Sequence, residues 1–352
     1  MKILLAFDSF KGCLSAPQAC EAAALGVRRA CPDVEVVQLP LSDGGEGLVE
    51  CLVRALGLQW VEAEVHDPLM RPLRARYAVS ADGATAYIEM ASAAGLPLLT
   101  PAERDPVRAT TYGVGELLLD AVGRGCHDVV MGIGGSATCD AGQGMLLALE
   151  GALPLPLRIT VACDVRNPLY GPEGAAYVFA PQKGATPQQV VQLDERLRRF
   201  AALSEAEHGV SPRFAHHPGA GAAGGLGYAL IAYLGAELCS GIDLVLQHLC
   251  FDRQLEDAAL VLTGEGCSDR QTLMGKVPQG VLQRSLGRHV PVHLLSGGIS
   301  DVDALLQAGF ASVRSINAQD SRPLSVLLQP QIASANLAQA VAQIVNNHLN
   351  QK

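Results

Sequence analysis

The residues of this chain that are best equipped for chemistry are lysines and acids that stand next to glycines. Only five of its 26 Lys and Arg residues are Lys, and two of those are at positions 2 and 352. The other three, Lys11, Lys183 and Lys276, each adjoin a glycine in an expected loop. Because Arg is the usual cation here, such lysines indicate places that need a compact ammonium group. The alternative is that three lysines adjoin glycines by chance.

Acidic residues occur at the same kind of position. Expected strand ends or glycine loops carry Asp8, Asp43, Glu46, Asp140, Asp164, Glu265 and Asp269. Mg²⁺ prefers one or two carboxylates together with phosphate oxygens, and lysines can neutralise a phosphoryl group during its transfer. Any one of these acids is more often a helix cap or loop ligand than a catalytic base. Their number therefore favours phosphoryl transfer.

A glycine-rich turn lies between an expected strand over residues 129–133 and an expected helix that begins near Asp140. The turn holds Gly134, Gly135, Ser136 and Thr138. The N-terminus of a helix presents unpaired N–H groups and the positive end of a dipole, which suit a phosphate. The turn also fits the loose dinucleotide pattern, but the acidic residue expected ~20 positions later is missing. The alternative is a tight turn that only packs a helix on a sheet.

Other catalytic motifs do not fit the sequence. Gly275-Lys276 is not a Walker A motif, because Arg270 stands where its first glycine belongs. A serine nucleophile elbow is excluded by Thr138. A second glycine run, Gly219, Gly221 and Gly224, has no strand before it, so it is not a dinucleotide site. The ten cysteines form no CxxC pair, which argues against zinc and disulfides and favours a reducing cytoplasm.

Composition indicates a globular protein of two domains. The chain has 352 residues, of which 49% are hydrophobic and 17% are charged. Its net charge of −9 and the lack of a basic stripe argue against nucleic acid as a partner. The first apolar run is too short for a signal peptide, and no apolar run approaches the ~20 residues of a membrane span.

The order of elements predicts an α/β fold. Strands are expected over residues 2–7, 34–39, 60–66, 74–80, 84–90, 129–133, 158–163, 177–180, 258–263, 290–295 and 312–316, with helices between most of them. We predict a Rossmann-like parallel-sheet domain from residues 1–62 and 242–352, in which ligands bind at the carboxyl ends of strands. A second α/β domain with a mixed sheet, residues 63–241, is inserted in it. We expect the active site in the cleft between them.

With these loops identified, the sequence resembles the bacterial glycerate kinase family. The resemblance covers nearly the whole chain, and it is carried by several long motifs in one order. They are DSFKGCLSA (8–16), SDGGEG (42–47), TTYGVGEL (110–117), GGSATCDAGQG (134–144), CDVRNPLYGPEGA (163–175), FAPQKGA (179–185), PGAGAAGGLG (218–227) and TGEGCSDRQTLMGK (263–276). The resemblance implies phosphorylation of glycerate by ATP with Mg²⁺, with 2-phosphoglycerate as the expected product.

The resemblance also implies roles for individual residues. Asp164 or Asp43 would orient the substrate hydroxyl, with Lys11 and Asp140 also at the catalytic site. Glu265 and Asp269 would bind Mg²⁺. The phosphates would be bound by Gly134, Gly135, Ser136, Thr138, Gly219, Gly221, Gly224, Gly264, Lys183 and Lys276.

The sequence departs from the family pattern at Cys139, where Asn is common, and at Cys267 and Ser268, where Arg and an aliphatic residue are common. These departures keep two alternatives open: a kinase of another small sugar acid, and a non-catalytic nucleotide or metabolite sensor on the same fold. The expected partners are glycerate and ATP, in a cytoplasmic protein that could form a homodimer.

Overall fold

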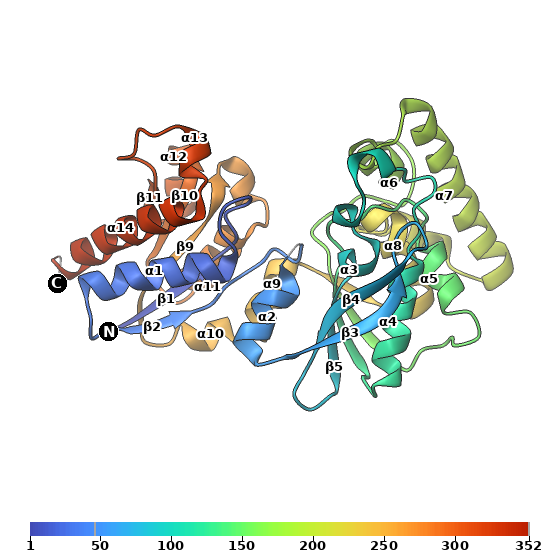
Figure 1. Cartoon of the computed structure of the whole chain (residues 1–352), viewed down its shortest axis with the longest axis horizontal. Helices are drawn as coiled ribbons and strands as arrows, with labels where there is room; N and C mark the ends of the chain where they lie inside the picture. The colour runs from blue at the N-terminus through green and yellow to red at the C-terminus, as the bar shows by residue number, and fades with distance from the viewer. Residues whose placement is uncertain (46, 351–352) are drawn as a thin grey trace. The chain divides into compact units, whose positions relative to one another are not determined.

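The computed structural model describes residues 1–45 and 47–350 (Figure 1). Its contacts divide the chain into two compact units. The first unit comprises Met1–Asp43, Glu50–Ala55 and Ile242–Lys352, and the second comprises Gly44–Val49 and Leu56–Gly241.

The first unit contains a sheet of five parallel strands in the order β11-β10-β9-β1-β2. The strands are β1 (Lys2–Phe7), β2 (Glu35–Gln38), β9 (Ala258–Ser268), β10 (Val292–Ile299) and β11 (Ser312–Ser315). Counted along the chain within this unit, the order is 2-1-3-4-5, which is a doubly wound arrangement. The strand order reverses between β1 and β9, and ligands of such sheets bind at the carboxyl ends of the strands on either side of that point.

Helices cover both faces of this sheet. Helices α1 (Ala16–Ala30) and α14 (Pro330–Leu349) pack against each other and form one core with the odd-numbered residues of β1, such as Ile3 and Leu5 (Figure 1). Leu4 on the opposite face is also fully buried, and α11 (Val277–Leu286) contacts β1, β9 and β10. Burial on both faces explains why β1 is a continuous apolar run.

Helix α1 begins at a reciprocal N-terminal cap. Ser15 is its N-cap: the Ser15 hydroxyl accepts from the Gln18 N–H, and the Gln18 side chain accepts from the Ser15 N–H. This reciprocal pair satisfies two N–H groups that the first turn would leave unpaired. The remaining helices that contain residues of this unit are α2 (Leu48–Leu56), α9 (Gly241–His248), α10 (Phe251–Gln254), α12 (Val302–Ala308), α13 (Leu324–Leu327) and the 3₁₀ turn η5 (Arg270–Leu273).

The second unit contains a mixed sheet of six strands in the order β3-β4-β5-β6-β7-β8. They are β3 (Gln59–His66), β4 (Pro72–Val79), β5 (Thr85–Glu89), β6 (Asp128–Gly132), β7 (Arg158–Ala162) and β8 (Glu237–Cys239). The first three are antiparallel and the remaining pairs are parallel. A parallel sheet in one unit and a mixed sheet in the other confirm the predicted fold class.

The second unit also contains α-helices and 3₁₀ turns. They are α3 (Ala91–Ala94), η1 (Leu96–Leu98), η2 (Pro101–Glu103), α4 (Tyr112–Gly123), α5 (Gln143–Ala148), α6 (Ala175–Phe179), η3 (Pro181–Lys183), α7 (Pro187–His208), η4 (Pro212–His216) and α8 (Ala222–Leu234). The strand expected over residues 177–180 is wrong, because these residues fall in and just after the short helix α6. The helix expected from Asp140 begins only at Gln143, and β8 was not predicted.

Residues 59–62, which the sequence assigned to the first domain, belong to β3 and so to the sheet of the second unit. Each of these residues is paired with a residue of β4. Across residues 1–45 and 47–350, no helix is long and apolar enough to cross a membrane.

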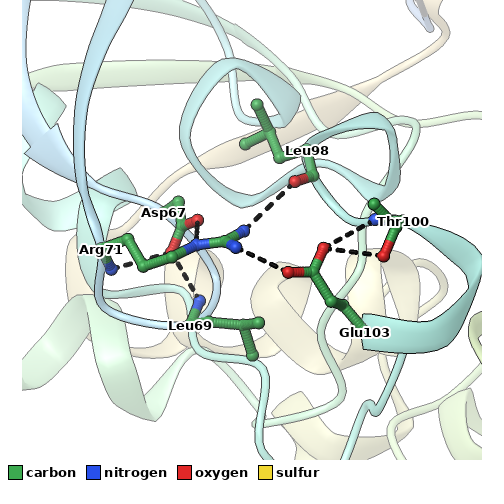
Figure 2. Close-up of polar contacts among 6 residues, drawn as sticks. All are labelled: Asp67, Leu69, Arg71, Leu98, Thr100 and Glu103. Atoms are coloured by element: carbon green, nitrogen blue, oxygen red, sulfur yellow. Dashed lines mark hydrogen bonds and ion pairs between the residues drawn. The ribbon is translucent and has the colours of Figure 1, made fainter.

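A cluster of charged residues fixes the β3–β4 turn of the second unit (Figure 2). The Arg71 guanidinium donates to Asp67 at 2.5 Å, to Glu103 at 2.7 Å and to the carbonyl oxygen of Leu98 at 3.4 Å. Glu103 in turn accepts from the backbone N–H and the hydroxyl of Thr100, both at 2.9 Å. The charged groups of Asp67, Arg71 and Glu103 bond to one another and to neighbouring backbone, so we interpret the cluster as structural.

Candidate functional site

Five charged residues line one cavity of about 300 Å³ in the first unit, at the reversal of strand order. They are Asp8, Lys11, Asp43, Glu265 and Lys276. Asp8 directly follows β1, and its N–H donates to the carbonyl oxygen of Gly264 in β9 at 2.9 Å. Glu265 is the next residue of β9. Parallel pairing of β1 and β9 therefore brings two acids together that are more than 250 positions apart.

The electrostatics of this cavity centre on Asp8. Burial, followed by the neighbouring Asp43 carboxylate, raises the pKa of Asp8 from 3.8 to about 7. The Glu265 carboxylate acts in the same direction, whereas a 2.6 Å hydrogen bond from the Ser9 N–H and the Lys11 ammonium favour the ionised form. Three carboxyl groups with a shared excess of negative charge form a site that a cation would stabilise.

Glu265 holds Lys276 in position. Its side chain is buried, with Oε1 accepting from the hydroxyls of Thr272 at 2.7 Å and Ser268 at 3.1 Å. The other oxygen, Oε2, lies 3.3 Å from the Lys276 ammonium. Because Oε1 has two donors and Oε2 has a cation, Glu265 is suited to orient Lys276 toward the cavity.

The predicted pairing of Glu265 with Asp269 at a metal has no support in this geometry. Asp269 caps the η5 turn, where its carboxylate accepts from the Gln271 N–H at 2.7 Å, and it is not among the residues that line the cavity. The acids brought together with Glu265 are Asp8 and Asp43. Within residues 1–45 and 47–350 no cluster of three metal-ligating side chains occurs. Mg²⁺ needs only one or two carboxylates when phosphate oxygens and waters complete its shell, so Asp8 and Asp43 fit it.

Gly264, which the sequence assigned to phosphate binding, has a packing role. It lies within β9, and a Cβ there would stand 1.8 Å from the carbonyl oxygen of Leu295 in β10. Only glycine permits this approach of the two strands.

In the second unit, Asp140 is enclosed rather than presented to a ligand. It is 3% exposed. One oxygen accepts from the Thr111 N–H and hydroxyl at 2.9 Å and from the Gly144 N–H at 3.1 Å, and the other accepts from the Gly142 N–H at 3.1 Å. The predicted catalytic role stays a prediction: in the structure the Asp140 carboxylate lies at the start of α5, and its four hydrogen bonds fix the loop.

The hydroxyls of the glycine-rich turn are also used within the second unit. Lys183, only 3% exposed, donates to the Thr138 carbonyl oxygen at 2.7 Å and to the Ser136 hydroxyl at 3.2 Å. The Ser136 hydroxyl in turn accepts from the Thr138 N–H at 3.1 Å. Burial lowers the pKa of Lys183 from 10.5 to about 8. These three residues close the turn, and the phosphate-binding role predicted for them stays a prediction.

The second glycine run packs against the first. A Cβ on Gly224 would lie 2.0 Å from the Thr138 carbonyl oxygen, and one on Gly221 would lie 2.3 Å from the carbonyl oxygen of Pro168. Gly219 and Gly224 have positive φ values of 93° and 68°. The run therefore permits close backbone packing, and its assignment to phosphate binding stays a prediction.

The surface that remains accessible in the second unit lies at the carboxyl ends of β6 and β7. Gly134 and Gly135 follow β6 and are partly or fully exposed, and Asp164 follows β7 and is exposed. One Asp164 oxygen accepts from the Gly241 N–H at 3.0 Å, which fixes the carboxylate. Of the residues predicted in this unit, these three are placed where a ligand could reach them.

Sequence patterns place Asp8 at a strand end and indicate no role for it. They give no indication of the residues after β11 that complete the cavity wall, namely Ile316, Asn317, Leu327, Leu328 and Ala333. A signal for Asp8 existed, because it stands directly after a buried strand. The other five carry no local signal: four are apolar residues typical of a core, and Asn317 is a single polar residue after a short strand.

The two cysteine departures lie in different environments. Cys139 is fully buried in a core cluster with Ala141 and Leu169, and burial raises its pKa to about 11. Cys267 is exposed and lines the cavity of the first unit. Only the second departure therefore changes a residue that a ligand of this cavity would meet.

Comparison with known proteins agrees with this architecture. The profile of the Glycerate kinase family matches residues 3–154 and 153–348. The chain is 42% identical to the glycerate kinase of Bacillus subtilis and 41% identical to the glycerate 2-kinase of Escherichia coli, with 90% of each chain covered in both comparisons. The crystal structure of a candidate glycerate kinase 2 from Salmonella typhimurium LT2 superposes with a TM-score of 0.86 at 37% identity, covering 100% of this chain and 99% of that one. The chain belongs to the glycerate kinase family.

Proposed function

We propose that this protein transfers the γ-phosphoryl group of ATP to a hydroxyl of glycerate, with Mg²⁺, and that 2-phosphoglycerate is the product. The observation that carries the proposal is the cavity at the β1–β9 reversal, where three acids and two lysines of the first unit converge. Membership in the family and the names of the relatives, a glycerate kinase and a glycerate 2-kinase, supply the substrate and the expected carbon.

The lysines of the cavity would bind the phosphates. Lys276 is held by Glu265 at 3.3 Å, which fixes the position of its ammonium group at the cavity wall. Lys11 is exposed at the cavity wall, in a turn closed by hydrogen bonds between Phe10 and Leu14. Two compact ammonium groups suit phosphoryl transfer, in which catalysis consists mainly of positioning and charge neutralisation.

Asp8 and Asp43 are the proposed ligands of Mg²⁺. Held by these two carboxylates, Mg²⁺ would supply positive charge to neutralise the phosphates during transfer. The raised pKa of Asp8 is consistent with this role, because carboxyl groups that disfavour one another's ionisation gain most from a cation.

Asp164 is the proposed base. In the reaction, the bond between the γ-phosphorus and its bridging oxygen to the β-phosphate breaks, and a bond forms between that phosphorus and the glycerate hydroxyl oxygen. The hydroxyl proton passes to the carboxylate. Asp164 is supported by its exposure after β7 and by the fixed orientation that the Gly241 N–H gives it.

The decisive experiment measures ADP release by the purified protein with ATP and Mg²⁺, using D-glycerate, L-glycerate and a few aldonates in turn. We expect release with glycerate, with the phosphate found on carbon 2 by NMR. Turnover only with another acid would reassign the substrate, and ATP binding without turnover with any acid would reject the kinase proposal. Addition of excess EDTA should abolish ADP release, and added Mg²⁺ should restore it.

A further inference from the structure

The cavity of the first unit has an apolar part that phosphates, Mg²⁺ and glycerate leave unexplained. Beside its charged residues it is lined by Phe10, Cys13, Ile316, Leu327, Leu328 and Ala333. Glycerate has three carbons that carry a carboxylate and two hydroxyls, so it offers nothing apolar to such a wall. A ligand that fills the whole cavity must have one charged and one apolar end.

The two parts of the wall come from different strands. Asp8 directly follows β1 and Glu265 lies within β9, whereas Ile316 directly follows β11. Since β10 lies between β9 and β11, the two parts are separated by two strand spacings, or about 10 Å. This separation is comparable with the reach from the base of a nucleotide to its outer phosphates.

Asn317 adds a polar group with a fixed direction to the apolar part. Its Nδ2 donates to the carbonyl oxygen of Gly297 at 3.0 Å, and its Oδ1 accepts from Asn336 at 3.0 Å. These two bonds fix which side of the amide carries Nδ2 and which carries Oδ1. A primary amide has two N–H groups and two lone pairs, so one donor and one acceptor remain for a ligand. A donor beside an acceptor is the pattern by which an Asn side chain pairs with adenine.

We propose that the apolar part of this cavity binds the base of the phosphoryl donor, with Leu327, Leu328 and Ile316 against its face and Asn317 on the edge of an adenine. This assignment rests on the proposed kinase function and extends it, because it places the whole donor in the first unit. The volume of about 300 Å³ is at the lower end of the ~300–1,000 Å³ of small-molecule sites, as expected if the phosphates extend toward the open side.

Helix α13 offers a matched pair of variants for the test. Leu328, at its C-cap, is 44% exposed and lines the cavity, whereas Leu324, at its first position, is 67% exposed and does not. Because both side chains are exposed, Leu328→Gln and Leu324→Gln should both fold. The measurements are the KM for ATP, the KM for glycerate, and inhibition by inorganic triphosphate, which has phosphates but no base.

We expect Leu328→Gln to raise the KM for ATP about 5- to 10-fold, since contacts between a base and a side chain contribute substantially to binding. Inhibition by triphosphate and the KM for glycerate should change by less than about twofold, and Leu324→Gln should match the wild type. Asn317→Ala should reduce the preference for ATP over GTP by about tenfold.

An unchanged KM for ATP in Leu328→Gln, or an equal effect of Leu324→Gln, would overturn the assignment. A rise in the KM for glycerate alone would also overturn it, because the acid would then occupy the apolar part. If the wild type forms no phosphorylated glycerate, the proposed function fails. The base site is then tested separately by calorimetric titration of the same variants with ATP and with triphosphate.

Discussion

Asp8 is held where its ionisation opposes folding. Its pKa is about 7 in the folded chain and 3.8 ordinarily, so the folded state binds the proton more tightly between these values. The ionised carboxyl therefore destabilises the fold above about pH 7, and this effect disappears as the pH falls toward 4. Acids that cost stability are a frequent feature of functional sites.

We therefore predict that Asp8→Asn raises the free energy of unfolding at pH 8 by on the order of 1 kcal/mol, a value discounted for solvent screening. The Asn oxygen can still accept from the Ser9 N–H. The gain should vanish near pH 4, while ADP release at pH 8 is lost. Urea denaturation at both pH values measures the effect, with the exposed Asp33→Asn as control. Equal effects at pH 4 and 8 would contradict the electrostatic cause.

Lys183 is the opposite case, a buried cation whose pKa falls from 10.5 to about 8. Between these values the unfolded chain binds more protons than the folded chain, so this residue makes the protein more stable as the pH rises. We predict that the wild type gains stability relative to Lys183→Met from pH 8 to 10.5, by up to about 3 kcal/mol at ~1.4 kcal/mol per pKa unit. Below pH 7 the difference between the two proteins should be constant. A constant difference up to pH 10.5 would contradict the burial of a titrating ammonium.

The glycine segments of the second unit act together as one packed element. Asp140, at the end of the first segment, uses the N–H groups at the start of α5, and Gly224 of the second lies against the carbonyl oxygen of Thr138. A Cβ at Gly224 would be 2.0 Å from that oxygen. A side chain there would also have to be accepted at a positive φ of 68°, which favours glycine. The backbone of both segments would have to move to accept it.

We predict that Gly224→Ala destabilises the protein by about 3–5 kcal/mol, or prevents folding. The matched control is Gly209→Ala at the C-cap of α7, where φ is 65° but no atom lies within 4 Å of the added Cβ. That variant should lose only about 1 kcal/mol, the cost of the backbone conformation alone. Thermal unfolding of both variants separates the two terms, and equal losses would show that packing at Gly224 is not limiting.

For the molecule as a whole, we propose that the nucleotide binds in the first unit, whereas the sequence analysis placed most of the phosphate site on glycine loops of the second. We predict that ATP with Mg²⁺ slows hydrogen exchange chiefly at residues 8–14, 264–276 and 316–333. Residues 134–144 and 216–227 should change little. Stabilisation of about 2.7 kcal/mol is expected at a ligand concentration of 100 times Kd. Protection centred on the glycine loops instead would contradict this placement.

Sequence alone determined the features that depend on neighbours along the chain. The parallel and antiparallel regions follow from the length and spacing of apolar runs, and the start of α1 follows from the Ser15 and Gln18 pair. The family likeness carried the expected chemistry. The strand expected over residues 177–180 failed because its few apolar residues suit a short helix equally well.

Only the tertiary structure decided which of the polar residues are available to a ligand. Lys183 hydrogen-bonds to Ser136 across 47 positions, and Thr111 hydrogen-bonds to Asp140 across 29. The partners of this lysine and this acid are therefore not encoded in local spacing. Conversely, Leu328 joins Asp8 in one cavity only because β11, β10, β9 and β1 are neighbours in the sheet. A hydrogen bond satisfies a group wherever its partner stands in the sequence, and burial depends on all neighbours at once. Local patterns therefore show where reactive groups occur, and only the fold shows which of them remain to react.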